Sequence, residues 1–241
     1  MYDTFVARIA GYTPHRFHLL NEHLTRAIAR KRVKPGDVVL DLGANNGFHT
    51  AVLALDVGEG GMVHAFEPNP DLWIHHLGQP NVRLWPVAVG DRVTVERLIT
   101  PVEGSNETAS LVDPRDHLGD IPVAFVSVPQ VTIDSLVELF DKRVSFVKID
   151  VERRELEAMR GMERLIRAYR PAIVFENQTP DIRRFLGSVG YRVSNIFPPA
   201  ADYPIICNCL ALHQDDAELE ALVSPPVEDL NALADWIEAN F

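Results

Sequence analysis

The chain has 241 residues, 46% of them hydrophobic, and a net charge of −11, a composition that suits one large globular domain and excludes general disorder. No apolar run approaches the ~20 residues that a membrane helix needs, and the first residues lack a signal-peptide pattern. Eight acids and no Lys or Arg lie in residues 214–241, and this acidic tail argues against a nucleic-acid partner. Cys207 and Cys209, the only cysteines, fit one face of a strand in a reducing compartment. We therefore expect a cytoplasmic protein without nucleic-acid or membrane partners.

Predicted helices and strands alternate along most of the chain, beginning with an amphipathic helix over residues 15–32. Further helices are predicted over residues 50–57, 155–169 and 180–189. Apolar runs predict strands at 38–42, 62–66, 82–89, 144–149, 172–175, 191–197 and 205–212, with extended pieces at 93–98 and 123–128. The alternation predicts an α/β fold, in which helices cover both faces of a mostly parallel seven-stranded sheet. The last two strands are joined without a helix, so we expect one antiparallel strand.

We divide the chain into an N-terminal helical segment (1–36), a main domain (37–213) and an acidic helical tail (214–241). Both terminal segments carry apolar stripes at helical spacing. Such stripes either pack on the main domain or join two copies of the chain, and we expect a homodimer.

A glycine-rich turn with the sequence Asp-Leu-Gly-Ala-Asn-Asn-Gly occupies residues 41–47, directly after the first predicted strand. Glycines let the backbone turn sharply and let a ligand approach closely, and the next helix offers unpaired N–H groups. Glu67 stands at the end of the second strand, where a carboxylate can accept hydrogen bonds from both hydroxyls of a ribose. The turn and Glu67 together predict a site for a nucleoside-containing cofactor.

A nicotinamide dinucleotide is the first alternative for this site. Its fingerprint has a glycine where this chain has Asn45. Asp41 would repel a pyrophosphate but suits a ligand that carries an ammonium and a sulfonium. S-adenosylmethionine has both cations and no phosphate, so the motif favours S-adenosylmethionine over NAD.

Four motifs, at residues 41–47, 66–70, 131–136 and 147–152, resemble in their order the signatures of FkbM-type methyltransferases, and the resemblance covers residues 37–197. It implies a Rossmann-like class I methyltransferase fold, S-adenosylmethionine as the methyl donor, and a hydroxyl acceptor, often on a saccharide or natural product. It also implies that Glu67 holds the ribose and that the glycine turn lines the methionine side. The predicted donor-binding residues are Asp41, Gly43, Asn45, Gly47, Thr50, Glu67, Pro68 and Ala88.

One motif departs from the family pattern. The family usually continues Asp-Val-Glu with Gly-x-Glu, whereas this chain has Arg153, Arg154 and Glu155. Two arginines at a helix start could recognise an anionic or polyhydroxylated acceptor, or they could point to solvent. The departure leaves the identity of the acceptor open.

Two acids, Asp150 and Glu176, end buried strands, and Asn177 follows directly. If these strands are neighbours, the three side chains offer oxygen ligands for a hard cation such as Mg²⁺. The arrangement resembles the site of magnesium-dependent O-methyltransferases, where the cation would acidify an alcohol. In the alternative interpretation, Asp150 orients the donor or caps a helix, and Glu176 pairs with an arginine.

The candidate catalytic residues are Asp150, Glu152, His49 and His117, of which Glu152 or a histidine would accept the hydroxyl proton. We expect the polar loop 104–110 to cover the site. The predicted function is therefore O-methylation by S-adenosylmethionine, assisted by a divalent metal, of a small-molecule or oligosaccharide acceptor. The alternatives are an NAD-linked oxidoreductase and a catalytically idle S-adenosylmethionine-binding partner protein.

Overall fold

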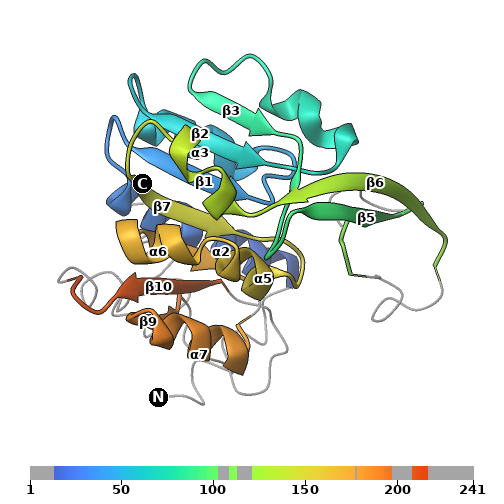
Figure 1. The fold of residues 1–241 in the computed structure, drawn as a ribbon. Coiled ribbons are helices and arrows are strands. Elements are labelled where there is room, and N and C mark those ends of the chain that lie inside the picture. Colours follow the sequence, from blue (N-terminus) through green and yellow to red (C-terminus); the bar gives the residue numbers. More distant parts are fainter. Residues whose placement is uncertain (1–13, 103–108, 113–120, 177, 197–207, 217–241) are drawn as a thin grey trace.

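A computed structural model describes residues 14–102, 109–112, 121–176, 178–196 and 208–216 (Figure 1). Its centre is a seven-stranded sheet with the order β3-β2-β1-β7-β8-β10-β9. The strands of this sheet are β1 (Val38–Leu42), β2 (Met62–Phe66), β3 (Val82–Trp85), β7 (Val144–Ile149), β8 (Ala172–Phe175), β9 (Tyr191–Asn195) and β10 (Cys209–His213). All its strand pairs are parallel except those of β10, which runs antiparallel to both β8 and β9. The predicted fold class, including the single reversed strand, is confirmed.

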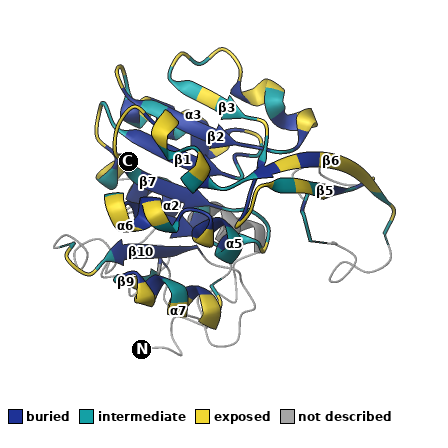
Figure 2. Cartoon of the chain, in the orientation of Figure 1, coloured by how far each residue is buried: buried dark blue, intermediate teal, exposed yellow. Residues whose placement is uncertain are grey.

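Helices cover both faces of this sheet. In the view of Figure 1, α5 (Glu155–Arg160), α6 (Glu163–Tyr169) and α7 (Pro180–Ser188) lie in front of it, and α2 (Pro14–Arg32) and α3 (Phe48–Val57) lie behind. Short 3₁₀ turns are η1 (Pro70–His76), η3 (Ile133–Ser135) and η4 (Val137–Leu139). Strands β1, β7 and β8 are almost entirely buried (Figure 2), as the continuous apolar runs of a two-sided parallel sheet require.

The pairing of β1 with β7 determines where the polar residues collect. Leu42 and Ile149, the last residues of these strands, are register partners. The glycine turn that follows β1 and Asp150, which follows β7, therefore leave the sheet side by side. In open α/β sheets, ligands bind at this carboxyl edge.

Helix α2 packs against α3 and β7, and buries Leu24 and Ile28. A buried polar contact attaches it to the start of β10, because the Asn208 backbone N–H donates to Asn21 and the Asn208 side chain donates to Thr25. The predicted homodimer rests on two apolar stripes. The stripe on α2 is buried within the protein itself, as far as its side chains are described. The other stripe lies in residues 217–241, outside the described residues.

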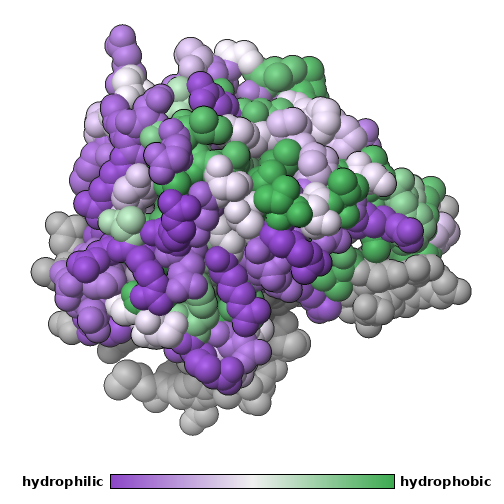
Figure 3. All heavy atoms as spheres, in the orientation of Figure 1, coloured by the Kyte–Doolittle hydropathy of each residue, from purple (hydrophilic) through white to green (hydrophobic). Residues whose placement is uncertain are grey.

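A second, three-stranded sheet forms an arm beside the main sheet, with the order β4-β6-β5. Its strands are β4 (Ala88–Val89), β5 (Thr94–Pro101) and β6 (Val123–Val131). One face of the arm carries exposed hydrophobic side chains, including Val95 and Phe125, and these gather at the right of Figure 3. Leu98, whose side chain points to the opposite face, is buried.

Two predicted elements differ from the structure. The predicted strand 82–89 is divided between the two sheets, as β3 and β4, because Pro86 cannot donate a ladder hydrogen bond. The predicted helix 155–169 consists of α5 and α6, separated at Gly161. Gly161 approaches Gly90 so closely that a β-carbon on it would lie 1.9 Å from the Gly90 carbonyl oxygen. Within the described ranges, no helix is long and apolar enough to cross a bilayer.

Candidate active site

The glycine turn after β1 has a left-handed backbone at Gly43 (φ 78°), Asn45 (φ 50°) and Gly47 (φ 81°). The N–H groups of Gly43 and Ala44 both donate to the Phe66 carbonyl at 3.0 Å, which fixes the turn to the end of β2. A β-carbon on Gly43 would lie 1.8 Å from the carbonyl oxygen of Asp150. Only glycine fits this close approach of the turn to the β7 loop.

Glu67 is buried beside this turn and uses both of its carboxylate oxygens. Oε2 accepts from the Asn45 N–H at 2.8 Å, and Oε1 accepts from the Asn69 N–H at 2.7 Å. Burial raises the pKa of Glu67, and the two backbone hydrogen bonds oppose that rise. Each oxygen keeps a second lone pair, so the carboxylate can still accept hydrogen bonds from a ligand.

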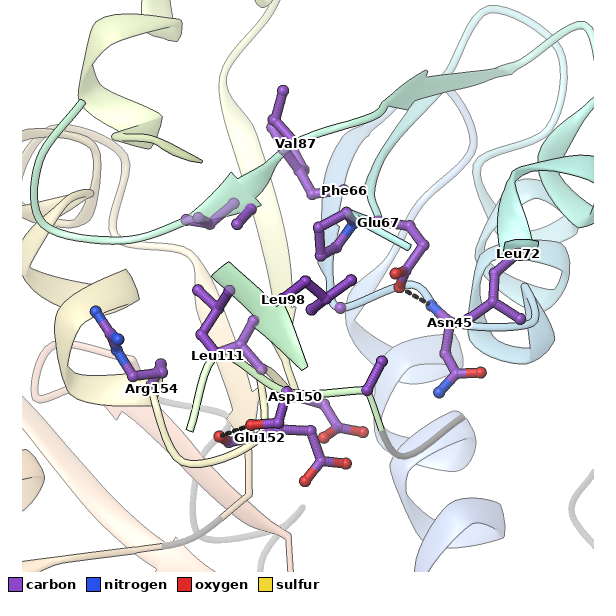
Figure 4. A pocket seen from close by; sticks show the side chains of 17 residues that line it. Asn45, Phe66, Glu67, Leu72, Val87, Leu98, Leu111, Asp150, Glu152 and Arg154 are labelled. Carbon is purple, nitrogen blue, oxygen red and sulfur yellow. Dashed lines mark hydrogen bonds between the residues drawn. The ribbon is translucent and has the colours of Figure 1, made fainter. Parts of the chain in front are cut away.

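A pocket extends from Glu67 to the loop after β7 (Figure 4). Its wall contains half of the predicted donor, catalytic and metal residues: Gly43, Asn45, Glu67, Pro68, Ala88, Asp150 and Glu152. The sequence did not indicate the apolar remainder, which includes Phe66, Val87, Leu98 and Leu111. Arg154, one of the two arginines that depart from the family pattern, also lines the pocket. The pocket therefore combines polar groups with apolar side chains, a lining that suits a nucleoside.

Three predicted donor residues do not line this pocket. Asp41 and Thr50 are wholly buried, and the Thr50 hydroxyl donates to Asp41 Oδ2 at 2.7 Å. Gly47 is buried behind the turn, where a β-carbon would lie 3.4 Å from the His75 carbonyl oxygen. These residues support the turn from behind.

Sequence reasoning missed Lys148, which lies on β7 and is only 5% exposed. Its ammonium is 3.3 Å from Asp150 Oδ2 and 3.7 Å from Asp41 Oδ1. Burial lowers the pKa of Lys148, but the charges of Asp150, Asp41 and Glu22, with the hydrogen bond to Asp150, together raise it by more, so the net shift is upward. The side chain stays charged near neutral pH and cannot act as the base. The sequence signal that could have indicated this buried ion pair was a single charged residue within an otherwise uncharged buried strand.

Several carboxylates lie close together in the segments that follow β7 and β8. Burial raises the pKa of Glu152 to about 7, and the charge of Asp150 adds to the rise. Burial, followed by the charges of Asp150, Glu152 and Glu155, raises the pKa of Glu176 to about 8. The backbone of the loop after β7 is unusual, because Glu152 (φ 52°) and Arg153 (φ 72°) are consecutive left-handed residues without being glycine. Strained backbone of this kind persists where the surroundings enforce it, often at functional sites.

Ser110 connects the arm to this loop. Its backbone exchanges two hydrogen bonds with Ile99, and its hydroxyl donates to the Glu152 carbonyl at 3.3 Å. Together with Leu98, residues 109–111 form the arm's side of the pocket. The predicted covering loop thus reaches the site at its last residues, whereas 103–108 lie outside the described residues.

The remaining candidates are the two histidines and the predicted metal ligands. His49 does not line the pocket, and its ring is paired with Glu22 of α2. His117 and Asn177 lie outside the described residues. Among the residues that are described, no three His, Cys, Asp or Glu side chains are grouped as a metal site. Asp150 and Glu176 interact electrostatically, and their carboxylate oxygens are of the type that Mg²⁺ prefers; the metal site stays a prediction.

A sequence profile of the methyltransferase FkbM domain matches residues 41–193. A methyltransferase FkbM from Methylobacillus flagellatus KT has a similar structure, with a TM-score of 0.50 and 16% identity. The alignment covers 76% of this chain and 44% of that protein, so the chain spans less than half of its length. None of the curated protein sequences compared with this chain matches it.

Two further solved structures are similar to this chain at lower TM-scores. A SAM-dependent methyltransferase from Aquifex aeolicus is 17% identical, with a TM-score of 0.42 and coverage of 86% of this chain and 92% of that one. Aeropyrum pernix fibrillarin, solved with natively bound S-adenosyl-L-methionine, is 11% identical, with a TM-score of 0.45 and coverage of 75% and 68%.

Proposed function

The chain belongs to the FkbM family of S-adenosylmethionine-dependent methyltransferases, and from that premise we propose that it methylates a hydroxyl group, with a divalent cation assisting. The acceptor that we propose is a saccharide or a glycosylated natural product. The observation that carries the proposal is the pocket itself, because Glu67, the glycine turn, Asp150 and Glu152 all line this one cavity. A donor held by its ribose at Glu67 would direct its methyl group toward these acids.

In the proposed reaction the chain's own residues bind, orient and accept a proton. Glu67 accepts hydrogen bonds from the ribose hydroxyls, and the apolar walls at Phe66 and Val87 hold the adenine. Glu152, which lines the pocket, accepts the proton of the acceptor hydroxyl as the oxygen attacks the methyl carbon. The arm excludes water from one side through Leu98 and Leu111.

The divalent cation belongs to the proposal through Asp150, Glu176 and Asn177. When bound, such a cation would acidify the acceptor hydroxyl and stabilise the developing alkoxide. Crowded carboxylates support it, because Asp150, Glu152 and Glu155 all raise the pKa of Glu176, and a cation would relieve their repulsion.

Two measurements test the proposal in sequence. Calorimetry should detect binding of S-adenosylmethionine and S-adenosylhomocysteine but not of NAD, and an absence of heat with both sulfur ligands would refute the donor. Transfer of labelled methyl groups to a panel of saccharides and glycosides should then identify the acceptor. Donor binding without transfer to any acceptor would instead favour the idle partner protein.

Chelation tests the cation separately. Exhaustive EDTA treatment should abolish transfer while donor binding persists, and Mg²⁺ should restore activity. The Glu176→Ala variant should behave like the chelated protein. Full activity after chelation would contradict the metal and leave Glu152 as the direct base.

A further inference from the structure

Lys148 occupies a position between the donor turn and the reaction site. Its ammonium is 3.3 Å from Asp150 Oδ2 and 3.7 Å from Asp41 Oδ1, and it donates to the Gly43 carbonyl at 3.5 Å. Gly43 and Asp150 both line the pocket, whereas Lys148 and Asp41 do not. Lys148 therefore contacts the pocket only through its neighbours.

The charges in this cluster do not cancel. When no divalent cation is bound at Asp150, the two carboxylates of Asp41 and Asp150 face one ammonium, which leaves one net negative charge beside the glycine turn. Asp41 Oδ1 is buried and has no hydrogen-bond partner among the described residues, so the Lys148 ammonium is what balances it. Glu22 also contributes to the field at Lys148, but it is paired with His49.

This charge matters because the donor changes its own charge during the reaction. S-adenosylmethionine carries one net positive charge near neutral pH, since its sulfonium and ammonium outweigh its carboxylate. As the methyl group moves, the carbon–sulfur bond breaks and its electron pair returns to sulfur, a carbon–oxygen bond forms, and the hydroxyl proton leaves to the base. The product S-adenosylhomocysteine has a neutral thioether and no net charge.

We infer that Lys148 is a positioning residue that sets the charge against which the sulfonium is bound, and thereby the preference of the site for S-adenosylmethionine over S-adenosylhomocysteine. The inference rests on the proposed function. With Lys148 present, the single net negative charge favours the charged donor moderately. Without it, two negative charges would stabilise the sulfonium in the ground state, and this stabilisation would be lost in the transition state as the positive charge disperses.

The test measures the affinities for the two ligands by calorimetry in the wild type and four variants, with EDTA present so that no divalent cation adds its charge at Asp150. Lys148→Met should raise the preference for S-adenosylmethionine by roughly fivefold or more, as expected for one unit charge several ångströms away, and should lower kcat. Asp41→Asn should lower the preference by a similar factor, because the carboxylate charge is removed while Asn can still accept from Thr50. The double variant should return to the wild-type preference, and Lys148→Arg should retain it.

The inference is overturned if Lys148→Met and Asp41→Asn leave the preference within twofold of wild type, or shift it in the same direction. If Lys148→Met fails to fold, Asp41→Asn and the double variant still decide the matter, because their expected preferences differ. A wild-type protein that binds neither ligand would refute the proposed function instead. If the wild type binds both ligands but the variants leave the preference for S-adenosylmethionine over S-adenosylhomocysteine unchanged, only the role of Lys148 is refuted.

Discussion

The hydroxyl of Ser110 donates to the carbonyl of Glu152 at 3.3 Å, so a residue of the arm holds the backbone of the candidate base. Glu152 and Arg153 are both left-handed at this point, and the Arg153 N–H donates to Glu155 at 3.1 Å. The loop is thus fixed from two sides. Its conformation depends on a long-range contact from the arm, which no local sequence pattern specifies.

Ser110→Ala should therefore reduce activity more than stability. The variant loses two hydrogen bonds, to the Glu152 carbonyl and from the Val112 N–H, each contributing about 1 kcal/mol to folding. Displacement of a catalytic group by ~1 Å can reduce the rate by ~10²-fold. We expect kcat to fall at least severalfold while the melting temperature falls by only a few degrees. Ser188→Ala, which removes an exposed hydroxyl bonded to the Phe185 carbonyl, is the matched control. Equal kcat values in the two variants would contradict the role of Ser110.

Glu67→Ala should weaken binding of both S-adenosylmethionine and S-adenosylhomocysteine. The variant loses hydrogen bonds to a charged group, each contributing about 1.5–3 kcal/mol, and it frees the Asn45 and Asn69 amides that Glu67 now holds. We expect calorimetry to show an affinity loss of at least tenfold for each ligand. Glu67→Gln should retain part of the affinity, because its amide oxygen can still accept from one backbone N–H. Unchanged affinity in Glu67→Ala would place the ribose elsewhere.

Arg153→Gly should stabilise the fold. A left-handed residue with a β-carbon costs about 1–2 kcal/mol, and the greater freedom of glycine in the unfolded chain offsets about 0.5–1 kcal/mol of the gain. We expect a net increase of about 1 kcal/mol in the free energy of unfolding, measured with urea. Arg170→Gly is the control, because Arg170 also has a left-handed backbone (φ 51°), at the C-terminal end of α6 and away from the pocket. It shows the effect of relieving the same backbone strain elsewhere. A loss of stability in Arg153→Gly alone would show that its side-chain contacts outweigh the strain.

His64 should make folding sensitive to mild acid. It is buried on β2, its Nδ1 accepts from the Trp85 indole at 2.9 Å, and burial lowers its pKa to about 4. Between pH 6.5 and 4 the unfolded chain binds a proton that the folded chain refuses, so the free energy of unfolding falls as the pH falls through this range. Below pH 4 the free energy of unfolding has lost the whole contribution of His64. At 1.36 kcal/mol per pKa unit, this loss reaches about 3 kcal/mol.

The measurement for His64 is urea unfolding at pH 7.5 and pH 5.0. His64→Gln can still accept from Trp85 and cannot be protonated in this range, so it should lose less stability on acidification than the wild type. His75→Gln changes an exposed histidine and should follow the wild type. Equal losses in His64→Gln and wild type would show that His64 does not govern this pH range.

Several parts of the site could be predicted because they depend on local chemistry. The glycine turn requires left-handed residues, and glycine and asparagine tolerate that conformation. Glu67 and Asp150 follow buried strands, and parallel strands bring their carboxyl ends to one edge. These residues line a common pocket, as expected from that geometry.

Other parts depend on contacts that are distant in sequence. Leu98 and Ser110 reach the pocket only because β5 pairs with β6 and forms the arm, and strand pairing at this separation has no local signature. Asp41 was expected to face the donor, but the structure places Lys148 and Thr50 against it. The environment of the Asp41 carboxylate thus depends on Lys148, which lies on another strand.

The position of β10 between β8 and β9 has a consequence for the order in which the protein folds. In the described sheet, β9 is an edge strand whose only partner is β10, yet β10 is made last of the three. During synthesis β8 must expose an unpaired edge, and β9 must remain unpaired, until residues 209–213 have left the ribosome. Exposed edges of this kind favour association with other chains. The nascent chain is therefore vulnerable to aggregation after β8 has been made and before β10, the last strand of the described sheet, arrives.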